Sequence, residues 1–168
     1  AALNAYVAQG GRVLLTGRSG IDPARGFMFD LGATWHGTNP YPSGDYVLHD
    51  KALRAGFVDD AIFMYTPSER ITITDGQSLG VIYDPYFERT PRHFSGHVHT
   101  PRKSDASGHA AGVRKGNTAY LAHPAFTAYR RSGSVAILEM IEKTIRFLLD
   151  DKPIAETSLP RAGRITVR

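Results

Sequence analysis

The chain has 168 residues, with 42% hydrophobic and 21% charged residues, which suits one globular domain with a sizeable core. It has no cysteine, so disulfides, thiolate zinc sites and a cysteine nucleophile are excluded. The net charge of +4 comes from scattered Lys and Arg without a nucleic-acid motif, and no apolar run approaches the roughly 20 residues that cross a bilayer. Nucleic acid and membrane are therefore not expected partners.

The N-terminal stretch predicts a helix followed by a buried strand. Residues 2–9 have helical periodicity, two glycines stop the helix, and Arg12 to Thr16 form a short apolar strand that ends in the loop Gly17 to Gly20. In open parallel sheets, ligands bind at such strand ends. The chain opens with neither Met nor a signal peptide. We therefore predict a piece of a longer, soluble protein whose first strands lie upstream, with residues 12–16 inside a mostly parallel sheet.

The middle of the chain reads as mainly β-structure. Asp22-Pro23 predicts the start of a short helix reaching about Leu31, and the GATWHG segment around Trp35 predicts a strand. Three β-like runs follow at 61–65, 70–74 and 79–83, with a turn signal at Asp75-Gly76. Short connections between these runs indicate an antiparallel excursion added to the α/β core.

The C-terminal third combines a hairpin with the strongest helix. Residues 110–114 and 118–122 flank Lys115-Gly-Asn117 as a hairpin, and residues 125–131 predict a short helix. Ser134 caps a helix that ends near Leu149. Its expected buried stripe consists of Val135, Leu138, Ile141, Ile145, Leu148 and Leu149. Beyond Pro153 we expect a polar tail with one late strand, Arg164 to Val167.

The region from Pro85 to Phe126 is the candidate functional region, because it holds five of the seven histidines. Histidine titrates near neutral pH and is the commonest metal ligand. His97 and His99 share the spacing that puts two imidazoles on one strand face. The candidate binding residues are Arg89, His93, His97, His99, His109 and His123.

Three chemical interpretations of this region remain open. A three-histidine metal site is possible by ligand type, but no HExxH frame surrounds the pair, and we expect no metal and no cofactor. The histidines can instead line a polar groove or an interface. A third interpretation is a sugar-binding surface, made by Trp35, Tyr41, Tyr86, Arg89 and His97. Since there is no GxSxG elbow, we predict no catalytic residue in this chain by itself.

Two stretches resemble known proteins. YVAQGGRVLLTG resembles the helix–glycine–strand of the trimerisation domain of β-galactosidases, which has the class I glutamine amidotransferase fold. YFERTPRHFSGHVHTP, the hairpin VRKGNTAYLAHPAFTAYRRSG and the apolar helix after it resemble the C-terminal region of bacterial glycoside-hydrolase-like proteins. The resemblance implies a three-layer, flavodoxin-like α/β sheet over residues 1–152, with a tail at 153–168. The relatives' amidotransferase cysteine is absent, so that activity does not carry over.

The function that the resemblance implies is an accessory or oligomerisation domain of a β-galactosidase-like enzyme. Such a domain follows a catalytic barrel and self-associates, or contributes a histidine- and arginine-rich wall to a carbohydrate site. The alternatives are a metal-dependent hydrolase and a carbohydrate-binding module that use the region from His93 to His123.

Overall fold

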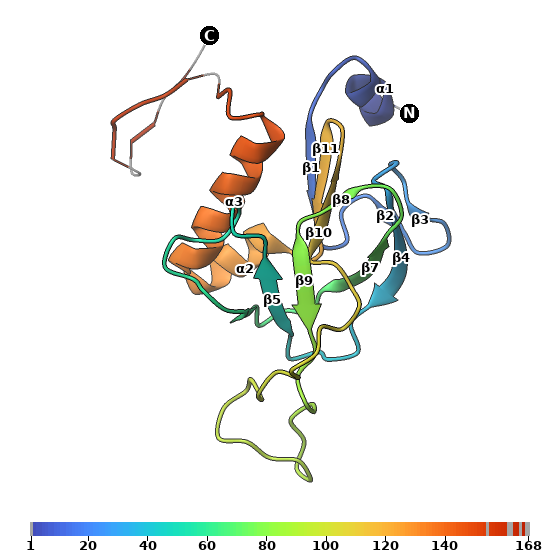
Figure 1. The fold of residues 1–168 in the computed structure, drawn as a ribbon, viewed down its shortest axis with the longest axis vertical. Coiled ribbons are helices and arrows are strands. Elements are labelled where there is room, and N and C mark those ends of the chain that lie inside the picture. The colour runs from blue at the N-terminus through green and yellow to red at the C-terminus, as the bar shows by residue number, and fades with distance from the viewer. Residues whose placement is uncertain (1, 154, 161–162, 165, 167–168) are drawn as a thin grey trace.

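The computed structural model describes residues 2–153, 155–160, 163–164 and 166. These residues form a mostly β structure of small sheets, with one helix at the N-terminus and two near the C-terminus (Figure 1). None of the helices among them is long and apolar enough to cross a membrane.

The largest sheet joins the N-terminal strand to the hairpin that precedes the two C-terminal helices. It has the order β1-β11-β10-β8, made of Val13–Thr16, Thr118–Leu121, Gly112–Lys115 and Gln77–Ser78. Strand β1 is parallel to β11, while the β11–β10 and β10–β8 pairs are antiparallel. The expected hairpin is therefore confirmed, but β1 lies at the edge of a mainly antiparallel sheet.

The remaining strands form three smaller sheets. Strand β4 (Ala33–Thr38) pairs with β7 (Glu69–Ile73), and β2 (Ile21–Asp22) pairs with β3 (Gly26–Phe27). Strand β5 (Tyr46–His49) lies between β6 (Ile62–Phe63) and β9 (Gly80–Tyr83). All of these pairs are antiparallel.

The predicted three-layer flavodoxin-like α/β sheet is therefore wrong. Parallel strands need long crossover connections, usually helical, but between β1 and β11 no helix is present, and every strand pair among the described residues except β1–β11 is antiparallel. The partner of β1 is not an upstream strand but β11, and the segment between them is β-structure rather than a helix. The helix–glycine–strand order at the start of the chain correctly predicted the N-terminal helix and β1 but not the strand with which β1 pairs.

The helix expected from Asp22 to Leu31 is also absent, because Asp22 starts a turn. Its carboxylate accepts hydrogen bonds from the backbone N–H groups of Ala24 (2.8 Å) and Arg25 (3.2 Å). Gly26 has a positive φ of 80°, which continues the turn into β3. Asp-Pro thus forms a tight β2–β3 connection here.

Helices α1 (Ala2–Ala8), α2 (Ala125–Ser132) and α3 (Val135–Leu148) match three predicted helices. Ser134 caps α3, and its Oγ accepts a hydrogen bond from Ile137 N. The predicted stripe on α3 needs correction. Its buried residues are Ile137, Met140, Ile141, Thr144 and Leu148, whereas Val135 is 50% and Ile145 is 38% exposed.

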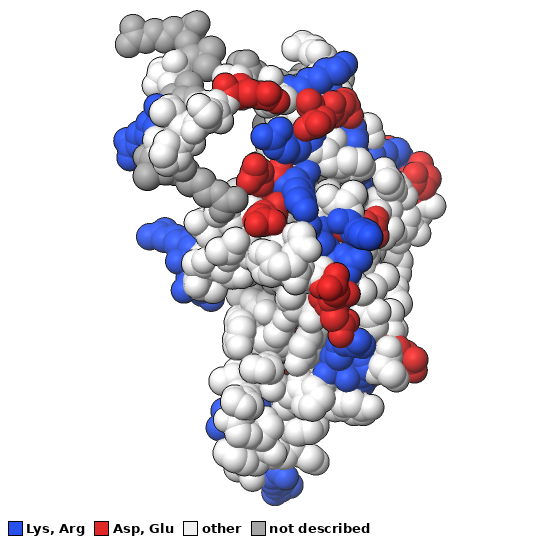
Figure 2. Space-filling view, turned by 60° about the vertical axis from the view of Figure 1, so that its left-hand side comes forward, with Lys and Arg blue, Asp and Glu red and all other residues white. Residues whose placement is uncertain are grey.

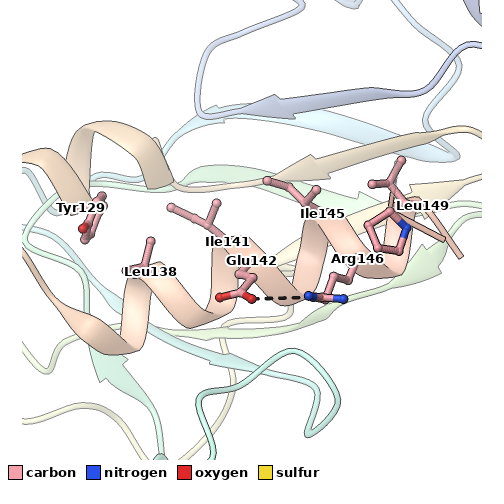
Figure 3. A pocket seen from close by; sticks show the side chains of 8 residues that line it. Tyr129, Leu138, Ile141, Glu142, Ile145, Arg146 and Leu149 are labelled. Atoms are coloured by element: carbon pink, nitrogen blue, oxygen red, sulfur yellow. Dashed lines mark ion pairs between the residues drawn. The ribbon is translucent and has the colours of Figure 1, made fainter. Parts of the chain in front are cut away.

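The outer side of α3 forms an apolar groove. Leu138, Ile141, Ile145 and Leu149 line it together with Tyr129 of α2, and Glu142 and Arg146 form an ion pair at its edge (Figure 3). Arg146 Nε lies 3.6 Å from Glu142 Oε1, one helical turn away on α3. The predicted late strand at 164–167 falls partly outside the described residues, and the described positions 164 and 166 belong to no strand.

A long loop between β9 and β10 leaves the body of the molecule at the end opposite α1 (Figure 1). We call residues 85–109 the projecting loop. On the face shown in Figure 2, its lower end carries Lys or Arg side chains and no Asp or Glu. The loop contains most of the predicted binding residues, so the fold presents them at one end of the molecule.

Candidate functional site

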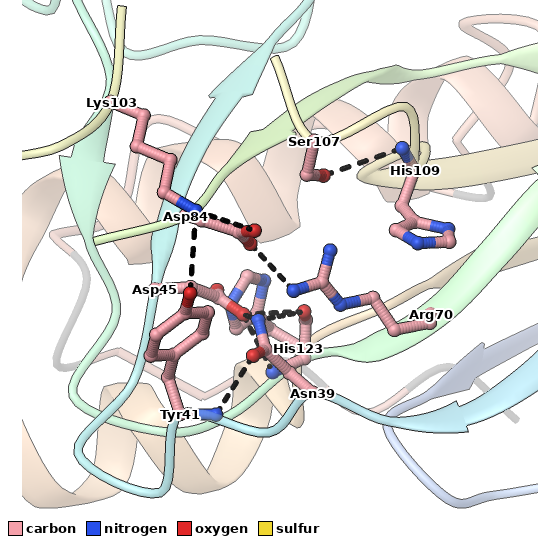
Figure 4. A network of polar contacts seen from close by, with 10 residues as sticks. Asn39, Tyr41, Asp45, Arg70, Asp84, Lys103, Ser107, His109 and His123 are labelled. Atoms are coloured by element: carbon pink, nitrogen blue, oxygen red, sulfur yellow. Dashed lines mark hydrogen bonds and ion pairs between the residues drawn. The ribbon is translucent and has the colours of Figure 1, made fainter. Parts of the chain in front are cut away.

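A buried polar network joins three strands at the centre of the molecule (Figure 4). Asp45 is fully buried just before β5, Ser68 lies just before β7, and His123 follows β11. Asp45 Oδ1 lies 2.5 Å from His123 Nε2, and Asp45 Oδ2 accepts hydrogen bonds from Ser68 Oγ at 2.6 Å and from Asn39 Nδ2. One carboxylate thus ties together segments that are far apart in the sequence.

Ordered hydrogen bonds favour the ionised form of Asp45. Burial by itself raises the pKa of this carboxyl, but the charge of His123 and the hydrogen bonds from His123 and Ser68 outweigh burial and lower the pKa. The Asn39 side chain is held in turn, because its Oδ1 accepts a hydrogen bond from Tyr41 N at 2.9 Å. The network therefore holds the buried Asp45 carboxylate in one position with both of its oxygens hydrogen-bonded.

The network contains Ser, His and Asp but lacks the order of a catalytic triad. In a triad the serine hydroxyl contacts the histidine, and the aspartate contacts the other histidine nitrogen. Here Ser68 Oγ donates to Asp45 instead, and Ser68 is fully buried. The geometry supports a structural clamp between β5, β7 and β11 rather than a nucleophile.

A second polar group lies beside this network, at the base of the projecting loop (Figure 4). Arg70 Nη2 donates to Asp84 Oδ1 at 2.5 Å, and Lys103 Nζ lies 3.8 Å from Asp84 Oδ2. His109 is half-buried, and burial first and the charge of Arg70 second lower the pKa of its imidazole. Arg70 thus attaches Asp84, directly before the projecting loop, to β7, and Lys103 on the returning arm of the loop pairs with the same carboxylate.

Backbone contacts also fix the stem of the projecting loop. Tyr86 N donates to Pro101 O at 2.9 Å, and Thr100 Oγ1 donates to Phe87 O at 2.8 Å. Arg102 Nη2 reaches the Asp60 carboxylate at 3.1 Å. The stem is therefore attached to the body, while the residues between 88 and 99 form the outer part.

The outer part of the loop exposes aromatic, histidine and arginine side chains. The rings of His97 and His99 stack at 5.4 Å, and Tyr65 Oη lies 3.2 Å from His99 Nδ1. The Arg89 guanidinium lies over the Phe94 ring at 4.8 Å, and Phe94 is 71% exposed. Together these groups make an amphipathic surface able to meet a sugar or another protein surface.

The six predicted binding residues do not form one cluster. Arg89, His93, His97 and His99 lie on the outer part of the projecting loop, His109 lies at its base, and His123 is 2% exposed in the core. Among the described residues, no group of three or more His, Asp or Glu is placed to hold a metal ion. The five residues of the predicted sugar surface are also separated, since Trp35 lies on β4 and lines another cavity with Phe29.

Two sets of polar residues were missed by the sequence-based reasoning. Asp45 and Ser68 have no motif around them, and their contact with His123 depends on the tertiary fold. Glu69 is 3% exposed and accepts hydrogen bonds from Trp35 and Thr38. The alternation at 70–74 was the available signal, because extending it by one residue places Glu69 on the apolar face of the strand with Ile71 and Ile73.

Comparisons with known proteins connect the chain to a carbohydrate-active enzyme. No protein-family model matches it, and no curated protein matches it. Among solved structures it resembles part of alpha-L-fucosidase isoenzyme 2 from Paenibacillus thiaminolyticus, with a TM-score of 0.81 and 35% sequence identity. The match covers 88% of this chain and 22% of that chain. This chain therefore resembles a segment of a bacterial glycoside hydrolase, and no feature specific to β-galactosidases is supported.

Proposed function

We propose that this chain is a non-catalytic accessory domain of a bacterial glycoside hydrolase. The observation that carries the proposal is the structural match, in which nearly the whole chain corresponds to only 22% of a fucosidase chain. A segment of that size leaves room in the larger enzyme for a separate catalytic domain. We place the accessory domain at residues 1–152.

The local chemistry supports a role without catalysis. Glycosidases use two carboxyl groups that flank the scissile bond. Two acids close to the stem of the projecting loop are occupied, because Asp84 pairs with Arg70 and Glu88 accepts a hydrogen bond from Ser43. The Asp45 carboxylate is enclosed in the core.

The projecting loop is the part of the domain best suited to meet a neighbouring domain. It exposes Tyr86 (61%), Phe94 (71%) and Val98 (48%). Large apolar side chains exposed close together are typical of an interaction surface. In the proposed arrangement, the loop packs against a neighbouring protomer of the enzyme. His97, His99 and Arg89 then form one wall of that protomer's carbohydrate site.

Two measurements on the purified chain test this proposal. We expect no hydrolysis of a chromogenic α-L-fucoside or β-galactoside, and concentration-dependent self-association in sedimentation experiments. Phe94→Ser should weaken the association, while Phe57→Ser, which changes a similarly exposed phenylalanine outside the loop (64%), should not. Hydrolysis by the chain alone, or equal effects of the two substitutions, would show the proposal to be wrong.

A further inference from the structure

A cavity of about 680 Å³ lies at the ends of β1 and β4, away from the projecting loop. Its walls come from the end of β1 and the loop after it, the end of β4, the segment before β7, and α2. The lining includes Thr16, Arg18, Thr38, Glu69, Thr127 and Arg131. This volume lies within the range of roughly 300–1,000 Å³ that is usual for small-molecule sites.

A buried carboxylate forms one part of the cavity wall. Glu69 is 3% exposed, its Oε2 accepts a hydrogen bond from Trp35 Nε1 at 2.7 Å, and Thr38 Oγ1 donates to its two oxygens at 3.1 and 3.2 Å. An irregularity in the β4–β7 register between Trp35 and Thr38 brings both residues to the same carboxylate. No ion pair among the described residues includes Glu69. Its remaining acceptor capacity suits ligand hydroxyl groups.

Positively charged side chains line another part of the same cavity. Arg18 and Arg131 are exposed lining residues, and neither side chain has a hydrogen bond or ion pair among the described residues. Arg131 lies in the last turn of α2, and Arg18 lies in the loop after β1. Two guanidinium groups without partners among the described residues favour an anionic ligand group, and guanidinium matches a carboxylate in shape.

We propose that this cavity binds an acidic monosaccharide of the hexuronate class. The uronate carboxylate lies at Arg18 and Arg131, and its ring hydroxyls donate to Glu69 and contact the threonine hydroxyls. Pro67 and Pro124 supply apolar surface for the C–H groups of the ring. This inference goes beyond the accessory role and does not depend on it, since it uses neither the projecting loop nor a partner domain.

The test is calorimetric titration of the full chain with D-glucuronate, D-glucose, acetate and inorganic phosphate. We expect glucuronate to bind about tenfold or more tightly than each of the other three, since only it offers both a carboxylate and ring hydroxyls. Arg131→Gln should weaken glucuronate binding about tenfold and leave glucose binding unchanged. Arg130→Gln is the matched control, because Arg130 is the exposed neighbour on α2 and does not line the cavity.

Several results would overturn the proposal. One is the absence of glucuronate binding, and another is binding of phosphate or acetate as tight as that of glucuronate, which would identify a general anion site. Equal effects of Arg130→Gln and Arg131→Gln would also overturn it. Because Arg131 is exposed, its substitution leaves the core intact and keeps the test valid even where Glu69→Gln disturbs folding.

Discussion

The folded protein should lose stability as the pH falls below about 6.5, because His49 is buried in its neutral form. This loss begins at a higher pH than the protonation of most carboxylates. His49 is 5% exposed, and its Nδ1 lies 3.0 Å from Leu79 O. Burial, assisted by the charge of His123, lowers the pKa of His49 from the ordinary 6.5 to about 4, and the contact with Leu79 opposes this only in part. The native state therefore keeps His49 neutral at a pH where the unfolded chain has already bound a proton.

The sign and size of the effect follow from this difference in proton binding. Below pH 6.5 the unfolded state binds one more proton at His49, so the free energy of unfolding falls as the pH drops towards about 4. At about 1.4 kcal/mol for each pH unit, the total loss is about 3 kcal/mol. That is a large part of the roughly 5–15 kcal/mol that holds a typical domain together.

Urea denaturation of the chain and of His49→Gln at pH values between 7 and 4.5 measures this contribution. Glutamine can still donate a hydrogen bond to Leu79 O but does not titrate in this range, so the variant should lose about 2 kcal/mol less than the original chain. Groups common to both proteins, such as His109 with its lowered pKa, cancel in the difference. Parallel stability curves for the two proteins would refute the reasoning.

Two further predictions concern the core. Asp45→Asn should lower the free energy of unfolding by about 3 kcal/mol, because it removes the charge that binds His123 and Ser68. A loss below about 1 kcal/mol in urea denaturation would contradict the role of the clamp. Ile137→Ala should lower the free energy of unfolding by about 2–5 kcal/mol, because the Ile137 side chain is only 4% exposed. Ile145→Ala on the same helix should lower it by less than about 1 kcal/mol, because Ile145 is 38% exposed. A cost for Ile145→Ala as large as or larger than that for Ile137→Ala would contradict this packing of α3.

Local elements of this fold could be predicted from the sequence. The cap at Ser134, the Lys115-Gly-Asn117 turn and the alternation in β7 each act within a few residues, and the structure confirms the elements that they indicate. The buried face of α3 was misjudged because both sides of the helix are apolar. The exposed side carries Val135 and Ile145, and no local pattern distinguishes it from the side that meets the sheets.

The sheet topology and the sites depend on long-range contacts that no local pattern contains. The pairing of β1 with β11 joins segments about a hundred residues apart, and His123 meets Asp45 across 78 positions. The histidine-rich region was recognised by composition, but composition did not separate the exposed His97 from the buried His123. The cavity around Glu69 likewise forms only when β4, β7 and α2 come together.

The most direct test of the proposed accessory role is kinetic and uses the longer enzyme of which we propose this chain to be a domain. His97→Ala should lower kcat/KM for a chromogenic glycoside about tenfold or more without changing the melting temperature, because His97 is exposed and we propose that it lines a neighbour's carbohydrate site. His36→Ala, which changes an exposed histidine on β4, should leave kcat/KM unchanged. An unchanged kcat/KM in His97→Ala would contradict the proposed contribution of the projecting loop.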